Sequence, residues 1–474
     1  MGMLKVNLFS PESLLHLLRR FNKCSNQVKQ IQSLLITNGH LMISDRWINT
    51  LLYNNLIRTY LNLSQPRTSL LLFIHMLQHQ APPNDHTIPS VLKATVFLKN
   101  SSFASSIGCS YHAQCVKRGL LHNHFVQASF LSLFSEFGDM SSACRMFDEM
   151  PRPCIVSYNA MLAAFGKSGD MGLAVSMFLN MPERDIYSWT SVINACMRKG
   201  RFREAIAFFS KMMVDGYVIC GLLRPNEATF VSILSACANL DDARALCLGK
   251  QVHGYLYRNT ESSVFLGTAL ISFYGKTGCL NYAIKIFDWM TVKEACTWNA
   301  IICSMASNGR EKQALRMFEA MKDSAFCPNE VTFVGVLSAC ARTKLVDLGL
   351  EMFHSMTRDF AIIPNMEHYG CVVDLLSRAG LLKEAYEFVG SMPFEADASV
   401  WGALLSACRV YGAVELGNKV GKRVLELEPQ CCGRYVVLSS IFAGANRWDD
   451  AAVLRQVMVD AGIQKVPAFS MGTK

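Results

Sequence analysis

Several patterns that would place this chain in a common class of protein are absent from its sequence. Although 51% of the 474 residues are hydrophobic, no run of about 18 uninterrupted apolar residues occurs, so we expect no membrane span. The 18 cysteines include no C-x-x-C pair and fall mostly within predicted helices, for example Cys196 and Cys340. Because cysteine is often buried as a small apolar residue, we predict free thiols in a reducing compartment and no disulfide framework.

Motifs for catalysis are also missing. The two G-K pairs at Gly166 and Gly275 lack the upstream glycine that a phosphate-binding loop requires, since Met161 and Leu270 stand there. No histidine combines with cysteine or carboxylates at zinc-ligand spacing, and neither the H-x-E nor the C-x-x-C element of zinc-dependent nucleotide deaminases occurs. We therefore expect no catalytic residue, no metal site and no cofactor, and we predict that the chain is not an enzyme.

Acidic residues are scarce at the amino terminus, where Glu12 is the one acid in the first 44 positions. The cations of that stretch are Lys5, Arg19, Arg20, Lys23 and Lys29. A basic, acid-poor start is typical of an organelle transit segment, which we place at residues 1–13. The alternative is that the stretch LLHLLRR is an imperfect first helix. The net charge of the chain is +9, and its sign favours a polyanion as partner.

What the chain does contain is a repeated pair of helices, seen most clearly in residues 155–185 (IVSYNAMLAAFGKSGDMGLAVSMFLNMPERD). Apolar residues from Tyr158 to Phe165 follow the i, i+3, i+4, i+7 spacing of one helix face. We expect Gly166 and the turn at residues 168–170 to end this helix, and a proline to end the second. The second helix carries an Ala, Met, Phe, Met stripe that recurs almost letter for letter at Ala143, Met146, Phe147 and Met150.

Alignment on this unit predicts repeats of 31 to 41 residues along most of the chain. Ten units span residues 50–84, 85–123, 124–154, 155–185, 186–226, 227–263, 264–294, 295–329, 330–365 and 366–397. A degenerate first unit precedes them at residues 14–49, two further helical hairpins follow at 398–470, and residues 471–474 form a tail. One unit cannot bury its apolar face alone, so neighbouring units must stack. We therefore predict an all-α fold, a right-handed α-solenoid superhelix of helix-turn-helix repeats with the first helices on its concave side; the handedness follows by analogy with other helix-pair solenoids.

These units resemble the plant pentatricopeptide repeat family, in the subfamily whose short, standard and long repeats alternate. MFDEMPRP, MFLNMPERD and SMPFEAD are similar to the ends of that family's second helices, and FVSILSACANL and FVGVLSACARTKLVDLG are similar to its long repeats. Residues 398–470 resemble the family's carboxy-terminal E motif. Some relatives carry a deaminase domain, of the type named DYW, after this motif, and we expect this chain to belong to the class without one.

The resemblance implies binding of single-stranded organellar RNA, with one base read by a few side chains of each unit. The residue types support this independently, because steps two, five and thirteen of each unit, counted from its first residue, fall on roughly one face of the first helix. An apolar side chain at step two can sandwich a base, and we assign this role to Val156, Tyr187 and Phe265. A cation at step thirteen can meet phosphate, and the candidates are Lys167, Arg198, Lys276, Arg342 and Arg378. The alternatives are that these cations complement the helix dipole and that the polar residues at step five simply face water.

By the same resemblance, the base is chosen by step five together with the residue just before the next unit. The candidate pairs are Asn54 with Asn84, Asn159 with Asp185, Thr190 with Asn226, Thr268 with Glu294, Asn299 with Asn329, and Gly370 with Asp397. In that order they imply a pyrimidine, uracil, adenine, a weak lean to purine, a pyrimidine and an uncertain base. Ala128 with Cys154 departs from the pattern. Pro89, Val231 and Val334, at step five of the long units, can neither donate nor accept a hydrogen bond, so no base is assigned to them.

The hypothesis from sequence is a monomeric, sequence-specific RNA-binding protein of a plant organelle, in the mitochondrion or alternatively the chloroplast. It would mark a cytidine for C-to-U editing, while a DYW-type deaminase or other editing factors, bound through the E region, perform the chemistry. One alternative is a factor for RNA stability, splicing or processing. Another is a protein-binding helical scaffold, which would lack the polar pairs at step five and the last step and would carry charged peptide clamps instead.

Overall fold

The protein is built from helices alone in the computed structural model, which describes residues 10–22, 24–42, 45–98, 104–219, 224–240, 242–259, 263–324 and 326–464. Within these ranges the chain forms 26 α-helices and two short 3₁₀ helices, and no strand. The chain divides into two compact units, Met1–Ala236 and Cys237–Lys474, and each is described by itself. The prediction of an all-α solenoid of helical hairpins is confirmed.

Helices α1 to α13 begin in the first compact unit. Their bounds are α1 Pro11–Arg20, α2 Ser25–Thr37, α3 Arg46–Asn62, α4 Pro66–Gln78, α5 Thr87–Phe97, α6 Ala104–Lys117, α7 His124–Glu136, α8 Met140–Asp148, α9 Ile155–Ser168, α10 Met171–Leu179, α11 Ile186–Arg198, α12 Phe202–Ile219 and α13 Glu227–Ala238. The two 3₁₀ helices, His40–Met42 and Leu120–His122, lie just before α3 and α7.

Helices α14 to α26 belong to the second compact unit. Their bounds are α14 Ala243–Asn259, α15 Val264–Lys276, α16 Leu280–Trp289, α17 Ala295–Ser307, α18 Glu311–Asp323, α19 Glu330–Thr343, α20 Val346–Arg358, α21 Met366–Ala379, α22 Leu382–Gly390, α23 Ala398–Tyr411, α24 Val414–Leu427, α25 Cys432–Gly444 and α26 Trp448–Asp460. No helix among the described residues is both long enough and apolar enough to cross a bilayer.

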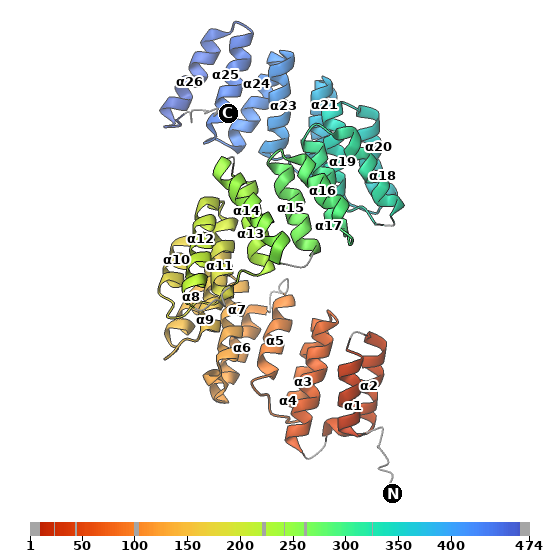
Figure 1. The fold of residues 1–474 in the computed structure, drawn as a ribbon, viewed down its shortest axis with the longest axis vertical. Coiled ribbons are helices and arrows are strands. Elements are labelled where there is room, and N and C mark those ends of the chain that lie inside the picture. The colour runs from red at the N-terminus through yellow and green to blue at the C-terminus, as the bar shows by residue number, and fades with distance from the viewer. Residues whose placement is uncertain are drawn as a thin grey trace. The chain divides into compact units, whose positions relative to one another are not determined.

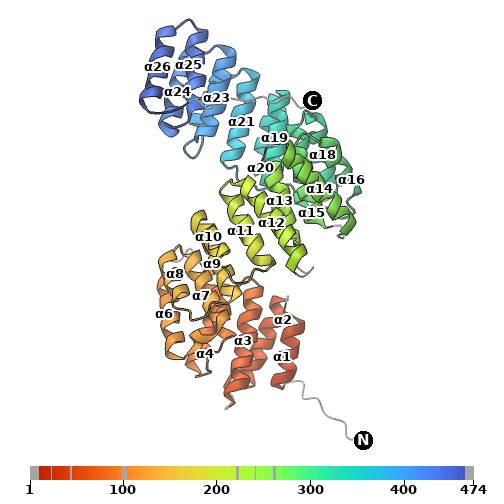
Figure 2. The same ribbon diagram turned by 60° about the vertical axis from the view of Figure 1, so that its left-hand side comes forward.

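Odd-numbered helices are the first helices of successive hairpins, and even-numbered helices are the second. Within the first compact unit each first helix from α1 to α9 packs on the next one, and within the second unit the same holds from α15 to α23. Each of these second helices packs on its own first helix, and most also contact the first helix that follows. Figures 1 and 2 show the hairpins stacked in chain order inside each unit. The first helices therefore form a continuous row in each unit.

The core between hairpins uses the stripe that the sequence repeats. Ala143, Met146, Phe147 and Met150 are all buried. In the later units the alanine, the phenylalanine and the last methionine of the stripe are buried, whereas its second residue, for example Met177 or Ile286, is half-buried. The phenylalanine of each stripe meets an aromatic residue at the fourth step of the next first helix. These ring pairs have centroids 4.7 to 6.0 Å apart and are Phe147–Tyr158, Phe178–Trp189, Phe209–Phe230, Phe287–Trp298, Phe318–Phe333 and Phe353–Tyr369. Edge-to-face contacts of this kind stabilise the stacking of one hairpin on the next.

A match of side-chain size also joins each second helix to the first helix that follows. In four second helices a buried glycine faces a large residue, so that an added Cβ would lie only 2.1 to 3.0 Å from it; the pairs are Gly108–Leu133, Gly249–Phe273, Gly349–Leu375 and Gly417–Ile441. Elsewhere the same step of the second helix holds a buried small residue, namely Ser69, Ala143, Ala174, Ala205, Ala283, Ala314 or Ala385. The tenth step of the following first helix is then small as well, namely Ala94, Ala164, Ala195, Ala236, Ser304, Ala339 or Ala407.

In the ten hairpins whose turn is described in full, the turn contains one residue in the left-handed region. Glycine holds this place in most hairpins, for example Gly169 with φ +87° after α9. Ser64, Lys344 and Asn446 hold it elsewhere with φ of 56°, 57° and 59°. The expected turn at residues 168–170 does end the first helix, since α9 stops at Ser168 with Gly169 as its cap, but Gly166 lies inside the helix and does not break it. An added Cβ on Gly166 would lie 3.1 Å from the Cβ of Ala195, so this glycine allows two first helices to pack closely.

The amino-terminal part differs in detail from the sequence expectation. Helix α1 begins at Pro11 with Ser10 as its cap, so LLHLLRR lies in a helix in which Leu14 and Leu18 are fully buried. Residues 1–9 of the expected transit segment lie outside the described residues. Helix α3 begins at Arg46, one turn before the expected unit start at Thr50, because Asp45 caps it by accepting from the backbone of Trp47 and Ile48.

Candidate functional site

The last residue of a unit is also the cap of the next first helix. Asp185, Glu294 and Asn329 each cap the helix that follows, and the side chains of Asp185 and Asn329 accept backbone N–H bonds from the third helical residue, Ser188 or Thr332. The hydroxyl at that third step accepts in turn from the backbone N–H of the cap, which completes a capping box. The side chain of the last residue is therefore fixed at the start of the next first helix.

The two Asn–Asn pairs of the sequence analysis are joined by direct hydrogen bonds. Asn54 Nδ2 donates to Asn84 Oδ1 over 3.0 Å, and Asn299 Nδ2 donates to Asn329 Oδ1 over 2.9 Å. Asn54 keeps this bond although α3 begins one turn early. The pairing between step five and the last residue thus links two consecutive units at both places.

The Asn159 and Asp185 pair has the same arrangement with a carboxylate in place of one amide. Asn159 Nδ2 lies 3.1 Å from Asp185 Oδ1 and 3.3 Å from Oδ2. The other side-chain atom, Asn159 Oδ1, is buried and has no hydrogen-bond partner among the described residues. A buried acceptor without a partner is uncommon in folded proteins and is costly to keep, which makes Asn159 Oδ1 a candidate for a hydrogen bond to a ligand.

Two further pairs are joined through a third side chain. Thr190 Oγ1 lies 2.8 Å from Thr229 Oγ1, and that hydroxyl lies 2.8 Å from Asn226 Oδ1. In the next example Thr268 Oγ1 lies 2.9 Å from Thr297 Oγ1, which accepts from the backbone of Glu294 over 3.3 Å. The linking threonine is the third residue of the following unit in both cases.

Besides the long units with Pro89, Val231 and Val334 at step five, two other units lack such a pair. Gly370 has no side chain, and Asp397 Oδ1 instead accepts from the backbone N–H of Ser399 and Val400. Partial burial works to raise the pKa of Asp397, but the bonds from Ser399 and Val400 together hold it below its usual value. Cys154, whose partner step holds Ala128, has its Sγ 3.6 Å from Ser157 Oγ. The Asp397 side chain caps its helix and that of Cys154 does not, and neither junction offers a paired amide or hydroxyl.

The polar side chains at step five are less exposed than side chains that project freely into solvent. The exposed fraction is 5% for Asn299 and 8% for Thr190, because each side chain is turned toward its partner at the next unit. Their step-two neighbours are open instead, with exposed fractions of 39% for Val156, 69% for Tyr187 and 61% for Phe265. The apolar residue therefore projects from the face, and the polar pair lies at its base.

One hollow shows how these steps meet on a single face. It has a volume of about 460 Å³ and lies along the first helices α15, α17 and the start of α19. Thr268 and Asn299 at step five, Asn329 at the last step, Val331 at step two and Lys276 at step thirteen all line it. The hollow thus combines apolar surface, hydrogen-bonding groups and a cation, as recognition of a stacked, negatively charged ligand requires.

The cations at step thirteen are exposed, and most already have partners on the chain. Lys167 pairs with Glu136, Arg342 Nε lies 3.3 Å from Glu311, and Arg378 Nε lies 2.7 Å from Asp374. Lys276 Nζ donates to Asn239 Oδ1 over 3.0 Å. Exposed ion pairs of this kind contribute little to stability, so a phosphate can replace the carboxylate at small cost. Arg198 is also exposed.

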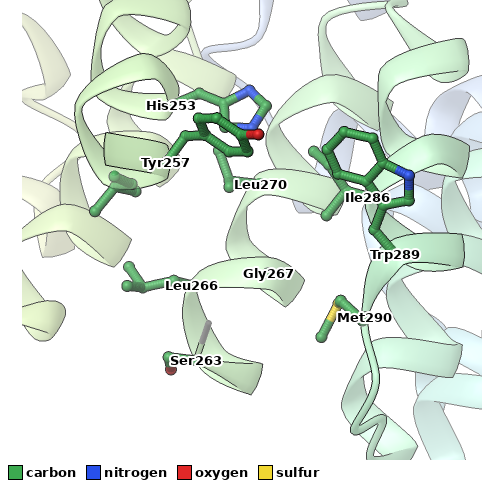
Figure 3. Close-up of a pocket in the computed structure, with 10 residues that line it drawn as sticks. His253, Tyr257, Ser263, Leu266, Gly267, Leu270, Ile286, Trp289 and Met290 are labelled. Carbon is green, nitrogen blue, oxygen red and sulfur yellow. The ribbon is translucent and has the colours of Figure 1, made fainter. Parts of the chain in front are cut away.

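A second hollow, shown in Figure 3, lies between the second helices α14 and α16 and has a volume of about 330 Å³. Tyr257 and Trp289 form its aromatic walls, with exposed fractions of 73% and 74% and ring centroids 6.5 Å apart. None of the site residues expected from sequence lines it. In the described part of the chain no group of three or more His, Cys, Asp or Glu side chains is arranged to hold a metal ion.

Sequence reasoning missed the third step of the units as part of the site. Thr87, Ser188, Thr229, Thr297 and Thr332 occupy it, and each bonds to the cap or to step five of the preceding unit. The signal was available, since a hydroxyl residue recurs three positions after an Asn, Asp or Glu, which is the pattern of a helix start.

Comparisons with known proteins agree with this architecture. The PPR repeat matches residues 129–153, 156–186, 331–359 and 367–394, the PPR repeat family matches 184–239 and 293–342, and the E motif matches 411–471. The maize pentatricopeptide repeat protein PPR10 has a similar fold, with a TM-score of 0.54 at 18% identity over 96% of this chain and 70% of that one.

Relatives in Arabidopsis thaliana cover nearly the whole chain. One pentatricopeptide repeat-containing protein is 48% identical over 465 residues, which is 98% of both chains. A second, named as chloroplastic, is 42% identical over 89% of this chain and 75% of its own length, and a third, named as mitochondrial, is 32% identical over 90% and 83%. With its repeated hairpins and its carboxy-terminal E motif, the chain belongs to the pentatricopeptide repeat family.

Proposed function

We propose that this protein binds single-stranded RNA along its first helices and reads one nucleotide with each unit that carries a polar pair. In pentatricopeptide repeats one base is read per repeat by two or three side chains. The observation that carries the proposal is that one arrangement recurs five times, with step five joined to the next helix cap either directly or through a hydroxyl. Packing alone does not require a polar pair at the same place in unit after unit.

The surroundings of each pair suit a nucleotide. Exposed apolar side chains such as Val156 and Tyr187 can stack on a base, and the polar pair between them can bond to the edge of that base. The step-thirteen cations Lys167, Arg198, Lys276, Arg342 and Arg378 contact phosphate in this proposal. Gly370 with Asp397 and Ala128 with Cys154 leave their nucleotides unread.

The more specific role that we propose is site recognition for C-to-U editing in a plant organelle. A deaminase supplied in trans would act on the RNA and would be recruited through the E region, helices α23 to α26. The E-motif match and the organellar names of relatives support this role, and we propose the mitochondrion as its location.

Binding is tested with an RNA oligonucleotide in the predicted order: pyrimidine, two unread positions, uracil, adenine, one unread position, purine, pyrimidine. We expect an exchange of the uracil and the adenine to weaken binding by about tenfold or more, since two hydrogen-bonded contacts are lost. Exchange of two bases at the unread positions is the matched control. Equal affinity for all three oligonucleotides would remove the assignment of these pairs.

Editing is tested by loss of the gene followed by sequencing of organellar transcripts. We expect one or a few cytidines to stay unconverted, each downstream of a match to the predicted order. A transcript that is depleted or unspliced, with every cytidine converted as usual, would show an RNA stability or splicing factor instead.

A further inference from the structure

The third residue of a unit forms hydrogen bonds with the polar pair that precedes it. Thr332 shows the arrangement most fully. Its hydroxyl accepts from the backbone N–H of Asn329 over 3.0 Å and donates to Asn299 Oδ1 over 2.6 Å. Asn329 Oδ1 meanwhile accepts from Asn299 Nδ2 at 2.9 Å and from the backbone N–H of Thr332 at 3.2 Å. Asn329 Oδ1 therefore accepts two bonds within the protein, while Asn299 Oδ1 accepts one, which holds that oxygen toward the hydroxyl.

The same network occurs in the first compact unit. Thr87 Oγ1 accepts from the backbone of Asn84 at 3.0 Å and donates to Asn54 Oδ1 at 2.6 Å. Asn84 Oδ1 accepts from Asn54 Nδ2 at 3.0 Å and from the backbone of Thr87 at 3.2 Å. Two sites far apart in the chain thus share the same bonds and nearly the same distances, which makes an accidental contact a poor explanation.

The amide groups that are not used in these bonds determine which base edge each site can bind. An asparagine amide has two N–H donors and one carbonyl oxygen. With Asn329 Oδ1 filled and Asn299 Oδ1 turned toward the hydroxyl, an Asn–Asn–Thr site presents chiefly its N–H groups to a ligand. Such a site fits a base whose pairing edge offers adjacent acceptors, as cytosine does with O2 and N3, better than uracil, whose N3–H needs an acceptor.

The Asn159 and Asp185 site behaves differently because its third residue is Ser188. Ser188 Oγ lies 2.9 Å from Asp185 Oδ1 and 3.0 Å from the backbone oxygen of Asp185, so its proton goes to the aspartate and not to Asn159. A carboxylate is a stronger acceptor than an amide oxygen, which accounts for this choice. Asn159 Oδ1 is left buried and without a partner in the described chain, so this site keeps an acceptor for an N–H donor such as N3–H of uracil.

We propose that Thr87 and Thr332 are positioning residues that select cytosine over uracil at the Asn54–Asn84 and Asn299–Asn329 sites, by holding each step-five amide with its oxygen toward the hydroxyl. The inference rests on the proposed one-base-per-unit binding of RNA. It adds a third determinant, on the following unit, to the two residues that touch the base.

The experiment compares affinities for two oligonucleotides that differ only in having cytosine or uracil opposite Asn299 and Asn329. The wild-type chain should prefer cytosine. In Thr332→Val the amide oxygen of Asn299 becomes available to uracil, so the ratio of the two Kd values should fall by about fivefold, which is the effect of one neutral hydrogen bond. Thr332→Ser keeps the hydroxyl, has no carboxylate beside it and should restore the ratio.

The matched control removes the same hydroxyl where it does not reach step five. Ser188→Ala also loses a buried hydroxyl of a capping box, but base preference opposite Asn159 and Asp185 should not change, because Ser188 does not bond to Asn159. Thr87→Val provides a second test at the other Asn–Asn site and remains usable if Thr332→Val fails to fold in a thermal melt.

The outcomes separate the two proposals. A wild-type chain that binds no RNA overturns both. A wild-type chain that binds the cytosine and uracil oligonucleotides equally overturns the selection of cytosine and leaves the proposed function, which assigns a pyrimidine to these sites, in place. A wild-type preference for cytosine that survives unchanged in folded Thr332→Val and Thr87→Val overturns the role of the threonines alone. An equal loss of preference at the Asn159 site in Ser188→Ala would show a general effect of cap removal and would also overturn it.

Discussion

At the scale of single residues, the same backbone conformation is imposed on different side chains. The hairpin turn places its residue in the left-handed region, which costs a residue with a Cβ about 1–2 kcal/mol. Glycine avoids this cost in most hairpins, whereas Lys344, at φ 57°, does not. The turn of the α19–α20 hairpin is therefore under backbone strain that the glycine turns of the neighbouring hairpins avoid.

We expect Lys344→Gly to raise the free energy of unfolding by about 0.5–1 kcal/mol, because the relief of strain exceeds the added entropy of the unfolded chain. Thermal or urea unfolding measures the change. Asn446→Gly is the control, since asparagine tolerates this conformation better and should show a smaller gain. A lower stability of Lys344→Gly would mean that the lysine side chain contributes more at this turn than its backbone costs.

At the scale of helices, the interface between hairpins is specified by pairs of side-chain volumes. Gly349 in α20 and Leu375 in α21 are closely matched, since an added Cβ on Gly349 would lie 2.3 Å from a Leu375 methyl group. Leu375 is fully buried and cannot turn outward. Neither residue can change size without a response from the other.

We expect Gly349→Ala to cost about 1–3 kcal/mol through overpacking, and Leu375→Ala to cost about 2–5 kcal/mol through the cavity that it leaves. The double variant should recover part of the loss, with a coupling energy of about 0.5–3 kcal/mol, because it recreates the small-on-small pair found at Ala314 and Ala339. Chemical denaturation of all four chains gives the cycle. Strict additivity would show that the two residues do not share one packing constraint.

At the scale of the whole molecule, a net charge of +9 acts together with cations placed at one step of the first helices. Under the proposed function, each phosphate contact releases counterions, so affinity falls as salt rises. The exposed Arg198 lies on the first helix α11, while the exposed Lys285 lies on the second helix α16. Both contribute one positive charge, but we place only Arg198 at the RNA.

We expect Arg198→Gln to weaken binding to all RNA sequences alike and to reduce the slope of log affinity against log salt by about 0.7, the value for one contact to a single strand. Lys285→Gln removes the same charge from the other row of helices and should leave the slope nearly unchanged. Titrations at several salt concentrations measure both. Equal slopes for the two variants would argue for a diffuse field in place of a defined contact.

Much of the fold was predictable, because helix periodicity and the Ala–Met–Phe–Met stripe report burial directly. The predictions that failed concerned single helix boundaries. Gly166 was expected to break a helix, but its lack of a side chain serves a close helix contact that no single-helix pattern reveals. The start of α3 was missed because Asp45 caps the chain one turn before the register that Asn54 sets.

The candidate site was predictable as a set of positions but not as a bonding network. A helical projection brings steps two, five and thirteen to one face, and the hollow along α15, α17 and α19 places examples of all three together. The burial of Asn299 was not foreseen, because Asn299 and Asn329 were paired as two contacts to one base and not as side chains that bond directly to each other. The role of Thr332 depends on hydroxyl geometry, which residue type alone does not give.

The pairing of glycine with a bulky residue has a consequence for how such chains can be shuffled. A duplicated or transplanted repeat whose second helix carries glycine would leave a void if the next repeat had alanine at its tenth step. A repeat whose second helix carries alanine would clash with a next repeat that has a large residue at its tenth step, as α21 has Leu375. Recombination, in nature or in a designed array, is therefore expected to move segments cut in the middle of a repeat, so that a second helix travels together with the first helix that follows it.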